Sequence, residues 1–362
     1  MIGNPPYVRR TSISKNDKQQ YGKKYKSATK QYDLYLLFIE MGMKQLSEKG
    51  HLCFINPIRF FNSDYGFGCR KFLVKNHRIR SVLDISQLPV FQNAMTYPCV
   101  MLLQQGYDSS NDIFYRRLSD LKEIQEVGKI CPIITSQKEI ELDSEHKFII
   151  YVDTSLRNLI KKIDSKCHLL SEYFDIARGL ANNKVNFDGS GYKALKSTNV
   201  RKYFIAGELN YIDTDFAKVF KEEMIILPRT VAYLQAMLKE KKIICLDRIY
   251  YLSPTTSINL KFILGVINAN LTNLWFECYY KTTKVQGNYF DLNGNQIGSI
   301  PIPPATAEQQ KPIIALVDKI LAAKKANPNT NTYALEAQID NLVYKLYSLD
   351  EEEIRIVEEK RE

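Results

Sequence analysis

Four residues near the start of the sequence, Asn4-Pro5-Pro6-Tyr7, have types and spacing that suit a hydrogen-bonding site. Each proline fixes its own φ angle and lacks an N–H donor, and a residue before a proline is pushed toward extended geometry. The segment therefore presents two acceptors, the Asn4 amide oxygen and the Pro5 carbonyl oxygen, beside the Tyr7 ring. Acceptors next to a ring suit a flat amine that is held and stacked. On the motif alone, a proline turn at a frayed terminus is the alternative.

Other patterns that carry chemistry are missing from the sequence. Seven cysteines are scattered without any C-x-x-C spacing and four histidines stand alone, so we expect reduced thiols and no metal site. We find no acid/base pair, no Ser/His/Asp set and no cysteine nucleophile motif. Neither a signal peptide nor a run of about 18 apolar residues is present. These observations predict a cytoplasmic protein that does not enter a membrane.

Charge is distributed unevenly along the 362 residues, whose net charge is +10. Residues 1–30 hold eight Lys or Arg against one Asp, whereas residues 331–362 hold four bases against nine acids. A basic body with an acidic tail favours a polyanionic partner, most simply nucleic acid. A solvated basic surface explains the charge equally well.

The spacing of apolar residues predicts an α/β fold for the first part of the chain. Residues 8–31 are basic and polar, which is typical of a mobile loop. A helix is expected to begin after Asp33 and to end at Gly50, and a second is expected over 64–76. Strands are expected at 51–56, 79–85, 98–103 and 114–115. Such alternation indicates a partly parallel sheet, and ligands bind such sheets at the loops that follow the strands.

The pattern of apolar and polar residues changes in the second part of the sequence. The alternation fades over 120–168, where we place a domain boundary. Short apolar runs then predict strands at 225–229 and 243–246, and one mostly buried helix is expected over 262–280. Further helices are expected at 308–325 and 333–347, before an acidic turn at 350–353.

These features suit an enzyme that modifies the exocyclic amine of adenine, which must first move the base out of the DNA stack. Asn4 and Pro5 would accept the amine protons. Tyr7 would stack on one side of the base, and Phe91 would lie across the strand ends. The protons of the base are then held directly, so this chemistry requires no carboxylate pair.

At this point the sequence resembles a known family. Asn4-Pro5-Pro6-Tyr7 resembles motif IV of the amino-group DNA methyltransferases of the adenine-N6 class, and Tyr32–Tyr35, Gly50–Pro57 and Val90-Phe91 follow in the order of that family's gamma arrangement. The second half resembles the target-recognition region of type IIG restriction-modification enzymes. Its matching segments are Ala177–Gly179, Leu227–Arg229, Phe262–Leu271, Ile300–Pro304 and Ile339–Tyr347.

The resemblance implies a fold and a set of domains. We expect a partial Rossmann-like methyltransferase sheet, followed by an α+β target-recognition domain and C-terminal helices. The implied divisions are residues 1–125 for the C-terminal half of the catalytic domain, 126–168 for a linker, 169–305 for DNA target recognition and 306–362 for a helical segment.

The resemblance also implies roles for residues. Asn4, Pro5, Pro6 and Tyr7 are the expected catalytic residues, with Tyr7 stacked on the flipped base and Phe91 against its other face or edge. Tyr35 and Phe38 would border the pocket of the cofactor, S-adenosylmethionine, with a purely core position as the alternative. For double-stranded DNA, the expected contacts are Arg9, Arg10, Lys23, Lys24, Arg178, Lys184 and Arg229. Without DNA, the basic residues 8–30 equally suit a disordered, solvated loop.

One departure from the family pattern concerns the cofactor. In that family the S-adenosylmethionine pocket is built mainly from a glycine-rich turn and an acidic strand end that both precede motif IV. Only three residues precede Asn4 here, and the later Gly66-x-Gly68 and Gly189-x-Gly191 lack the third glycine of G-x-G-x-x-G. We therefore expect a truncated portion of a longer enzyme, without an N-terminal methyltransferase or nuclease region and inactive alone.

Three functions remain open from the sequence. The first is part of a site-specific DNA adenine-N6 methyltransferase of the type IIG class. The second is a DNA-binding specificity module with no catalytic activity of its own. The third is a methyltransferase that acts on protein glutamine or RNA, against which the long recognition-like second half argues.

Overall fold

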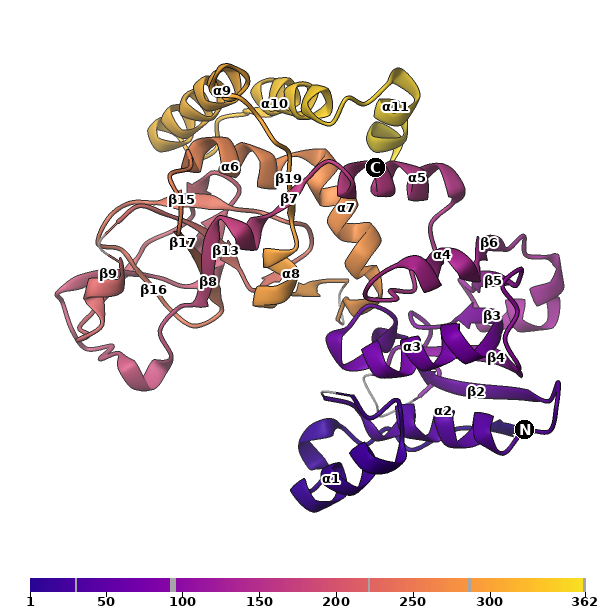
Figure 1. Ribbon diagram of the computed structural model, residues 1–362. Coiled ribbons are helices and arrows are strands. Elements are labelled where there is room, and N and C mark those ends of the chain that lie inside the picture. The colour runs from indigo at the N-terminus through magenta and orange to yellow at the C-terminus, as the bar shows by residue number, and fades with distance from the viewer. Residues whose placement is uncertain (30, 92–95, 221, 286–287, 361–362) are drawn as a thin grey trace. The chain divides into compact units, whose positions relative to one another are not determined.

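The computed structural model describes residues 1–29, 31–91, 96–220, 222–285 and 288–360. The chain forms two compact units, Met1–Arg157 and Asn158–Glu362 (Figure 1). The division falls within helix α5 (Thr154–Asp164). Residues 126–168, where the sequence predicted a linker or boundary, contain this division and also β6 (Ile133–Ser136) and α4 (Gln137–Leu142).

The first unit is built on a six-stranded sheet with the order β1-β2-β4-β3-β5-β6. The strands besides β6 are β1 (Ile2–Gly3), β2 (His51–Pro57), β3 (His77–Asp84), β4 (Pro98–Gln105) and β5 (Asp112–Arg117). Strand β1 pairs parallel with β2, and β3 pairs parallel with β5, whereas β4 runs antiparallel between β2 and β3. Strands β1, β2, β3 and β5 therefore run in one direction. This confirms the predicted α/β class with a partly parallel sheet.

Helices α2 (Leu34–Lys44) and α3 (Phe67–Asn76) pack on this sheet. A side chain at Gly42 would meet Leu52 of β2 at 3.1 Å, so this glycine lets α2 lie close to the strand. Asp33 is the N-cap residue of α2, as expected, but its carboxylate does not cap the helix. It accepts a hydrogen bond from the Arg10 amide instead (2.8 Å).

The basic segment after the opening motif is ordered, and the prediction of a mobile loop was wrong for its described residues. It contains α1 (Lys15–Lys24), which Ser14 caps by accepting the Asp17 amide (3.1 Å). The far end of the segment is fixed by Glu40 of α2, whose carboxylate accepts the Lys26 and Ser27 amides (3.0 and 2.7 Å). The composition of the segment does not reveal that it is ordered, because the side chains that anchor it belong to residues further along the chain.

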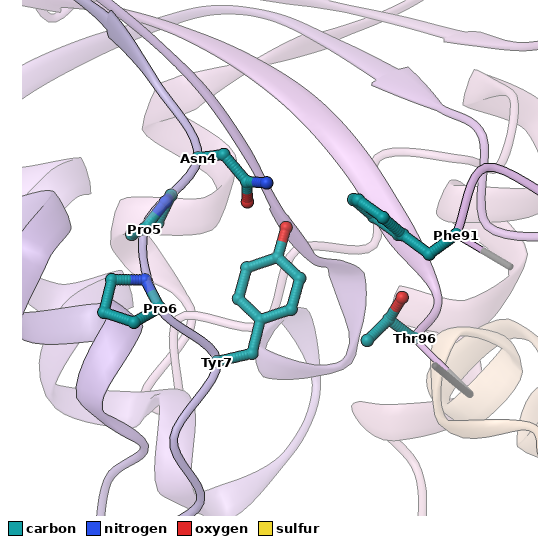
Figure 2. Close-up of a pocket in the computed structure, with 6 residues that line it drawn as sticks. All are labelled: Asn4, Pro5, Pro6, Tyr7, Phe91 and Thr96. Atoms are coloured by element: carbon teal, nitrogen blue, oxygen red, sulfur yellow. The ribbon is translucent and has the colours of Figure 1, made fainter. Parts of the chain in front are cut away.

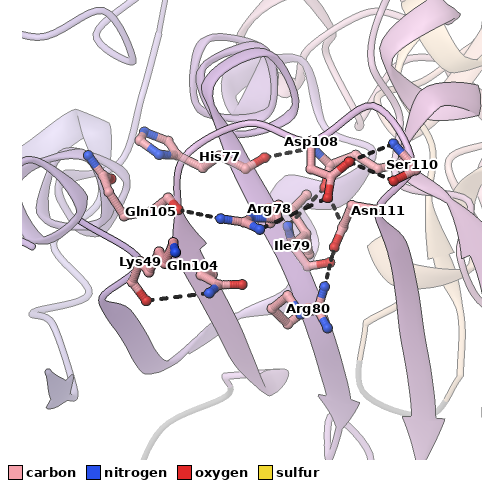
Figure 3. Close-up of polar contacts among 11 residues, drawn as sticks. Lys49, His77, Arg78, Ile79, Arg80, Gln104, Gln105, Asp108, Ser110 and Asn111 are labelled. Carbon is pink, nitrogen blue, oxygen red and sulfur yellow. Dashed lines mark hydrogen bonds and ion pairs between the residues drawn. The ribbon is translucent and has the colours of Figure 1, made fainter. Parts of the chain in front are cut away.

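Polar side chains close the end of the sheet at which β3 begins (Figure 3). Arg78 donates to the Gln105 carbonyl (3.1 Å), and Arg80 donates to the Asn111 side chain (2.7 Å). Asn111 in turn donates to the Ile79 carbonyl (2.9 Å). These residues bond to one another, so this end is a structural closure and the opposite end, where the parallel strands finish, is left for a site.

The second unit contains two main sheets. Strands β8 (Phe174–Arg178), β13 (Met224–Pro228), β15 (Met237–Lys239) and β17 (Ile249–Pro254) form an antiparallel sheet in the order β15-β13-β17-β8. Strands β9 (Tyr192–Leu195), β12 (Asn210–Ile212) and β16 (Ile244–Cys245) form a second in the order β12-β9-β16. Leu195, Phe220, Ile226 and Ile244 belong to the apolar core that joins them. The predicted strands near 225 and 243 are both present.

The second unit also contains several α-helices. They are α6 (Leu260–Asn268), α7 (Asn270–Tyr280), α8 (Gly294–Gly298), α9 (Ala307–Ala326), α10 (Tyr333–Leu346) and α11 (Glu351–Glu359). The single helix expected over 262–280 is broken at Ala269, whose backbone is extended. The Asn268 side chain bonds both to the amide and to the carbonyl of Ala236 (2.8 and 3.0 Å), and Asp340 accepts the Asn270 amide (2.8 Å). Among the described helices, none has the length and apolar character needed to cross a membrane.

Candidate active site

The opening motif lies at the carboxyl ends of the parallel strands. Strand β1 ends at Gly3, which pairs with Phe54 of β2, and Asn4 follows directly. Phe91 follows the carboxyl end of β3 in the loop that leads to β4. Open α/β sheets bind ligands at this edge, and the sequence predicted the same placement.

These residues surround one hollow of about 260 Å³, lined by Asn4, Pro5, Pro6, Tyr7, Phe91 and Thr96 (Figure 2). Its volume is near the lower limit of small-molecule sites, about 300 Å³. The structure thus brings the four motif residues and Phe91 together. The rest of the predicted Phe91 loop, residues 92–94, falls outside the described residues.

Tyr7 is held rigidly at the centre of the site. Its hydroxyl donates to the Ile55 carbonyl (2.9 Å), and its ring packs edge-on against Tyr35 and Phe91, with centroids 6.0 and 6.2 Å away. Burial, with a smaller effect of the Cys99 thiol, raises the pKa of Tyr7 to about 12, so the phenol stays neutral. The Tyr7 and Phe91 rings lie at 89° to each other. A base stacked flat on Tyr7 therefore meets Phe91 with perpendicular planes, and the two rings do not form a parallel sandwich.

Two polar side chains that line the hollow have no hydrogen-bond partner among the described residues. The Asn4 amide is exposed and makes no hydrogen bond to the described residues, and it points toward the space beside Tyr7 (Figure 2). The Thr96 hydroxyl is shielded from solvent yet also lacks a partner within the described ranges. Buried polar groups usually have partners, so an unpaired hydroxyl in a hollow suits a bound ligand. Sequence reasoning missed Thr96, because a single threonine before an aromatic residue carries no pattern.

The residues predicted to border the cofactor pocket do not line the hollow. Tyr35 is 1% exposed, shares a hydrogen bond with Tyr65 (3.2 Å) and supports the Tyr7 ring from behind. Phe38 is half-buried in the same helix. Every residue that lines the hollow in the described part of the chain is uncharged. These residues do not fit S-adenosylmethionine, which brings a carboxylate, an ammonium and ribose hydroxyls, but they do fit a flat neutral base.

The predicted DNA-contacting residues fall into two groups. Arg9, Arg10, Lys23 and Lys24 are all exposed on the basic segment beside the motif. In the second unit each predicted cation is already engaged. Arg178 pairs with Asp247 (2.5 Å), Arg229 pairs with Asp291 through two nitrogens (2.8 and 3.1 Å), and the Lys184 ammonium lies 4.8 Å from the centre of the Phe216 ring.

Two family models match the chain, one within each compact unit. Residues 1–91 match the family described as Eco57I restriction-modification methylase, and residues 184–302 match the TaqI-like C-terminal specificity domain. The chain therefore carries one segment similar to a restriction-modification methylase and one similar to a specificity domain. The resemblance found in the sequence is confirmed.

The relatives are longer than this chain. The type II restriction enzyme and methyltransferase RM.Eco57I of Escherichia coli is 30% identical over 58% of the chain and 21% of that protein. The type II methyltransferase M.HincII of Haemophilus influenzae is 28% identical over 56% of the chain and 42% of that protein. The chain thus spans about a fifth to two fifths of the length of these curated relatives.

Solved structures show the same fold at low identity. The type IIL restriction-modification enzyme MmeI, in complex with DNA, has a TM-score of 0.63 at 11% identity, over 98% of this chain and 55% of that one. A nuclease-deletion mutant of the type ISP enzyme LlaGI has a TM-score of 0.53 at 12% identity, over 89% of this chain and 35% of that one.

Proposed function

We propose that this chain supplies the target-base site and the recognition domain of a DNA adenine-N6 methyltransferase of the type IIG class. One observation carries the proposal. The hollow at the ends of the parallel strands combines a fixed aromatic ring with the Asn4 amide and the Thr96 hydroxyl, neither of which has a partner among the described residues. Such a site suits a base that has left the DNA stack.

Each group has a task in holding the base. The Asn4 amide oxygen and the Pro5 carbonyl oxygen accept the two protons of the adenine amine. Bonds to these acceptors draw the nitrogen lone pair out of conjugation with the ring, where it can meet an electrophile. Tyr7 stacks on the base, and each such contact contributes about 1–3 kcal/mol, which offsets the few kcal/mol that extruding a base costs.

The methyl donor of this reaction is S-adenosylmethionine, which supplies the methyl group when bound. Because the residues of the hollow do not fit it, we assign them to the base alone. The chain's own contribution is to hold the base, keep the amine protons on fixed acceptors and position the DNA. The basic segment around α1 grips phosphates, and the second unit reads the sequence.

The base site can be tested without knowing the recognition sequence. A duplex with one extrahelical adenine needs little energy to place that base in the hollow, and we expect it to bind at least several-fold more tightly than a duplex with an extrahelical thymine. Asn4→Ala should remove this preference and leave affinity for a fully paired duplex within a few fold. Asn341→Ala, at an exposed position on α10, is the matched control and should keep it. If Asn4→Ala also keeps it, the assignment of the base site is wrong.

A second candidate function is a specificity module that binds DNA without turnover. The observation in its favour is the poor fit of the hollow to S-adenosylmethionine. The two functions separate when the chain is incubated with S-adenosylmethionine and a mixed pool of duplexes, and the DNA is digested and analysed by mass spectrometry for N6-methyladenine. Methylated adenine supports the first function, and salt-sensitive binding without methylated adenine supports the second.

A further inference from the structure

A tight backbone crossing in the second unit fixes the turn between β16 and β17. Gly179, just after β8, passes so close to this turn that a side chain there would meet the Leu246 carbonyl at 2.2 Å. Three backbone hydrogen bonds hold the crossing: Gly179 to Ile249, Leu180 to Cys245 and Asp247 to Leu180, with lengths of 2.8, 2.8 and 2.7 Å. The turn is therefore rigid before any ligand arrives.

Arg248 lies in this turn in an unusual conformation. Its φ is +71°, a left-handed geometry that glycine adopts without cost and other residues adopt with strain. Its carbonyl accepts the Arg229 amide (2.7 Å), which adds a fourth backbone bond to the turn. The Arg248 side chain is exposed and has no hydrogen bond or ion pair within the described part of the chain. No such contact of the side chain offsets the strain, and strain of this kind concentrates at functional sites.

Two further arginines flank Arg248. Arg178 pairs in register with Tyr250, and Pro228, directly before Arg229, pairs with Ile249. Neighbouring strands lie about 4.8 Å apart, so Arg178, Arg248 and Arg229 form a row across one end of the sheet, which we call the arginine row. The outer two are bound to Asp247 and Asp291. The central guanidinium is the one that is not bound to a carboxylate of the described residues.

The carboxylates of Asp247 and Asp291 determine which kind of ligand can bind at the arginine row. A surface that grips phosphates has a clear excess of cations over acids, as the basic segment around α1 does. Asp247 and Asp291 would repel a phosphate that approached the row, but they do not repel the uncharged edge of a base. The fork of an arginine matches the O6 and N7 acceptors of guanine in the major groove.

We propose that Arg248 is a specificity-determining residue that reads a guanine in the DNA sequence bound by the second unit. The inference rests on the proposed function of this unit as a DNA recognition domain. Arg178 and Arg229, held by their carboxylates, frame the position of the central guanidinium. The strained and rigid turn keeps that guanidinium on a fixed platform.

The test compares two glycine substitutions in the full chain. Arg248→Gly removes the guanidinium and also relieves the strained φ, so its Tm should equal or exceed that of the wild type. The matched control is Lys242→Gly, at another exposed cation with a φ of +63° in the same unit. Each protein selects duplexes from a randomised pool, and affinities are then measured on the selected duplex and on a scrambled one.

For Arg248→Gly we expect the preference for guanine to disappear at one position of the selected sequence. Affinity for the wild-type duplex should fall about 5- to 140-fold, the equivalent of one bidentate base contact, while affinity for the scrambled duplex stays within twofold. Arg248→Lys should lose most of the same preference, because an ammonium cannot make the bidentate contact. Lys242→Gly should select the same duplex sequence as the wild type and bind it with the same affinity.

Three results would overturn the inference while leaving the proposed function intact. They are an unchanged preference in Arg248→Gly, an equal loss of affinity on all duplexes, which indicates a phosphate contact, and a fall in Tm, which indicates a structural role. A wild-type chain that binds no duplex would overturn the proposed function and this inference with it.

Discussion

At the scale of single residues, the site depends on which atoms are already engaged within the protein. The Tyr7 hydroxyl donates to the Ile55 carbonyl, so the ring, and not the hydroxyl, is offered to a ligand. Asn4 and Thr96 show the opposite, because their polar atoms have no partner in the described chain. The engaged group keeps the site rigid, and the unengaged groups are those that our proposal assigns to the base.

Substitutions at Tyr7 separate these two roles. Tyr7→Phe keeps the ring and loses one hydrogen bond, so we expect the free energy of unfolding to fall by about 1 kcal/mol and the preference for an extrahelical adenine to stay within twofold. Tyr7→Ala removes the stacking surface and should weaken base capture by about 1–3 kcal/mol. Urea denaturation and duplex binding measure the two effects. Equal loss of the adenine preference in both variants would show that the hydroxyl contacts the base.

At the scale of elements, a buried carboxylate links α1 to α2. Glu40 is completely buried and accepts the Lys26 and Ser27 amides, and it also pairs with Lys44 at 2.6 Å. These bonds lower the pKa of Glu40 even though burial alone would raise it. Glu40 thus fixes the end of the segment that carries the basic residues beside the site.

Glu40→Gln tests this link. Hydrogen bonds to a charged group are worth about 1.5–3 kcal/mol, so we expect a loss of about 2 kcal/mol in the local stability of residues 15–27. Hydrogen exchange at the Lys26 and Ser27 amides should quicken more than exchange in the β-sheet. Glu48→Gln, at an exposed carboxylate, is the control and should leave this exchange unchanged. Unchanged exchange in Glu40→Gln would mean that the segment is held by other contacts.

The same elements show how far sequence reasoning reaches. Period and capping are local signals, and they placed β2, β3, β4 and the start of α2 within a few residues. Order in the segment around α1 was missed because it depends on Glu40, 13 and 14 residues beyond the amides that it binds. The break at Ala269 was missed because Asn268 bonds to Ala236, 32 residues earlier. Contacts of this kind have no periodicity to detect.

The residues of the candidate site also divide into those that the sequence reveals and those that it does not. Asn4 to Tyr7 are contiguous, and their chemistry is readable from residue types alone. Phe91 was reachable because it follows a predicted strand at the ligand-binding edge of the sheet. Thr96 and Arg248 were not reachable. Thr96 is singled out because its hydroxyl has no partner among the described residues, and Arg248 because its φ is positive. Neither property can be predicted from the residue type alone.

At the scale of the whole molecule, positive charge is concentrated near the site and negative charge near the C-terminus. Lys23 and Lys24 are exposed on α1, in the region where bases exceed acids by seven. Each phosphate contact that is removed lowers the salt slope of DNA binding by about 1. We expect the double variant Lys23→Gln, Lys24→Gln to lower the slope of log K against log salt by about 2, with equal loss on every duplex sequence.

The control for this prediction carries the same charge change in the acidic region. The double variant Lys345→Gln, Lys360→Gln removes two exposed lysines there and should leave the slope unchanged. Titrations between 50 and 300 mM salt, about a twofold range of Debye length, measure both slopes. Equal changes in the two variants would show that net charge, and not contact by α1, sets the affinity.

Stability of the first unit should depend on pH through one buried histidine. His77, the first residue of β3, is 6% exposed, packs against Phe72 with ring centroids 4.8 Å apart, and has two ring nitrogens without partners in the described chain. Burial lowers its pKa from 6.5 to about 4. The unfolded chain therefore takes up a proton near pH 6.5, whereas the folded chain does so only near pH 4. Between these values the unfolded state binds more protons, so stability is complete above pH 6.5 and falls as pH decreases toward 4.

A shift of this size corresponds to at most about 3 kcal/mol of unfolding free energy between pH 7 and pH 4. In His77→Leu that part of the pH dependence should disappear, because no proton can bind at the site. An apolar replacement also removes two unpaired polar atoms, so stability at pH 7 should change by less than about 1.5 kcal/mol. Urea denaturation at pH 7 and pH 4.5 measures both quantities. His51→Leu, at an exposed position on β2, is the control and should keep the pH dependence of the wild type. If His77→Leu loses as much stability at pH 4.5 as the wild type does, carboxylates such as Glu40, and not His77, set the acid limit of the fold.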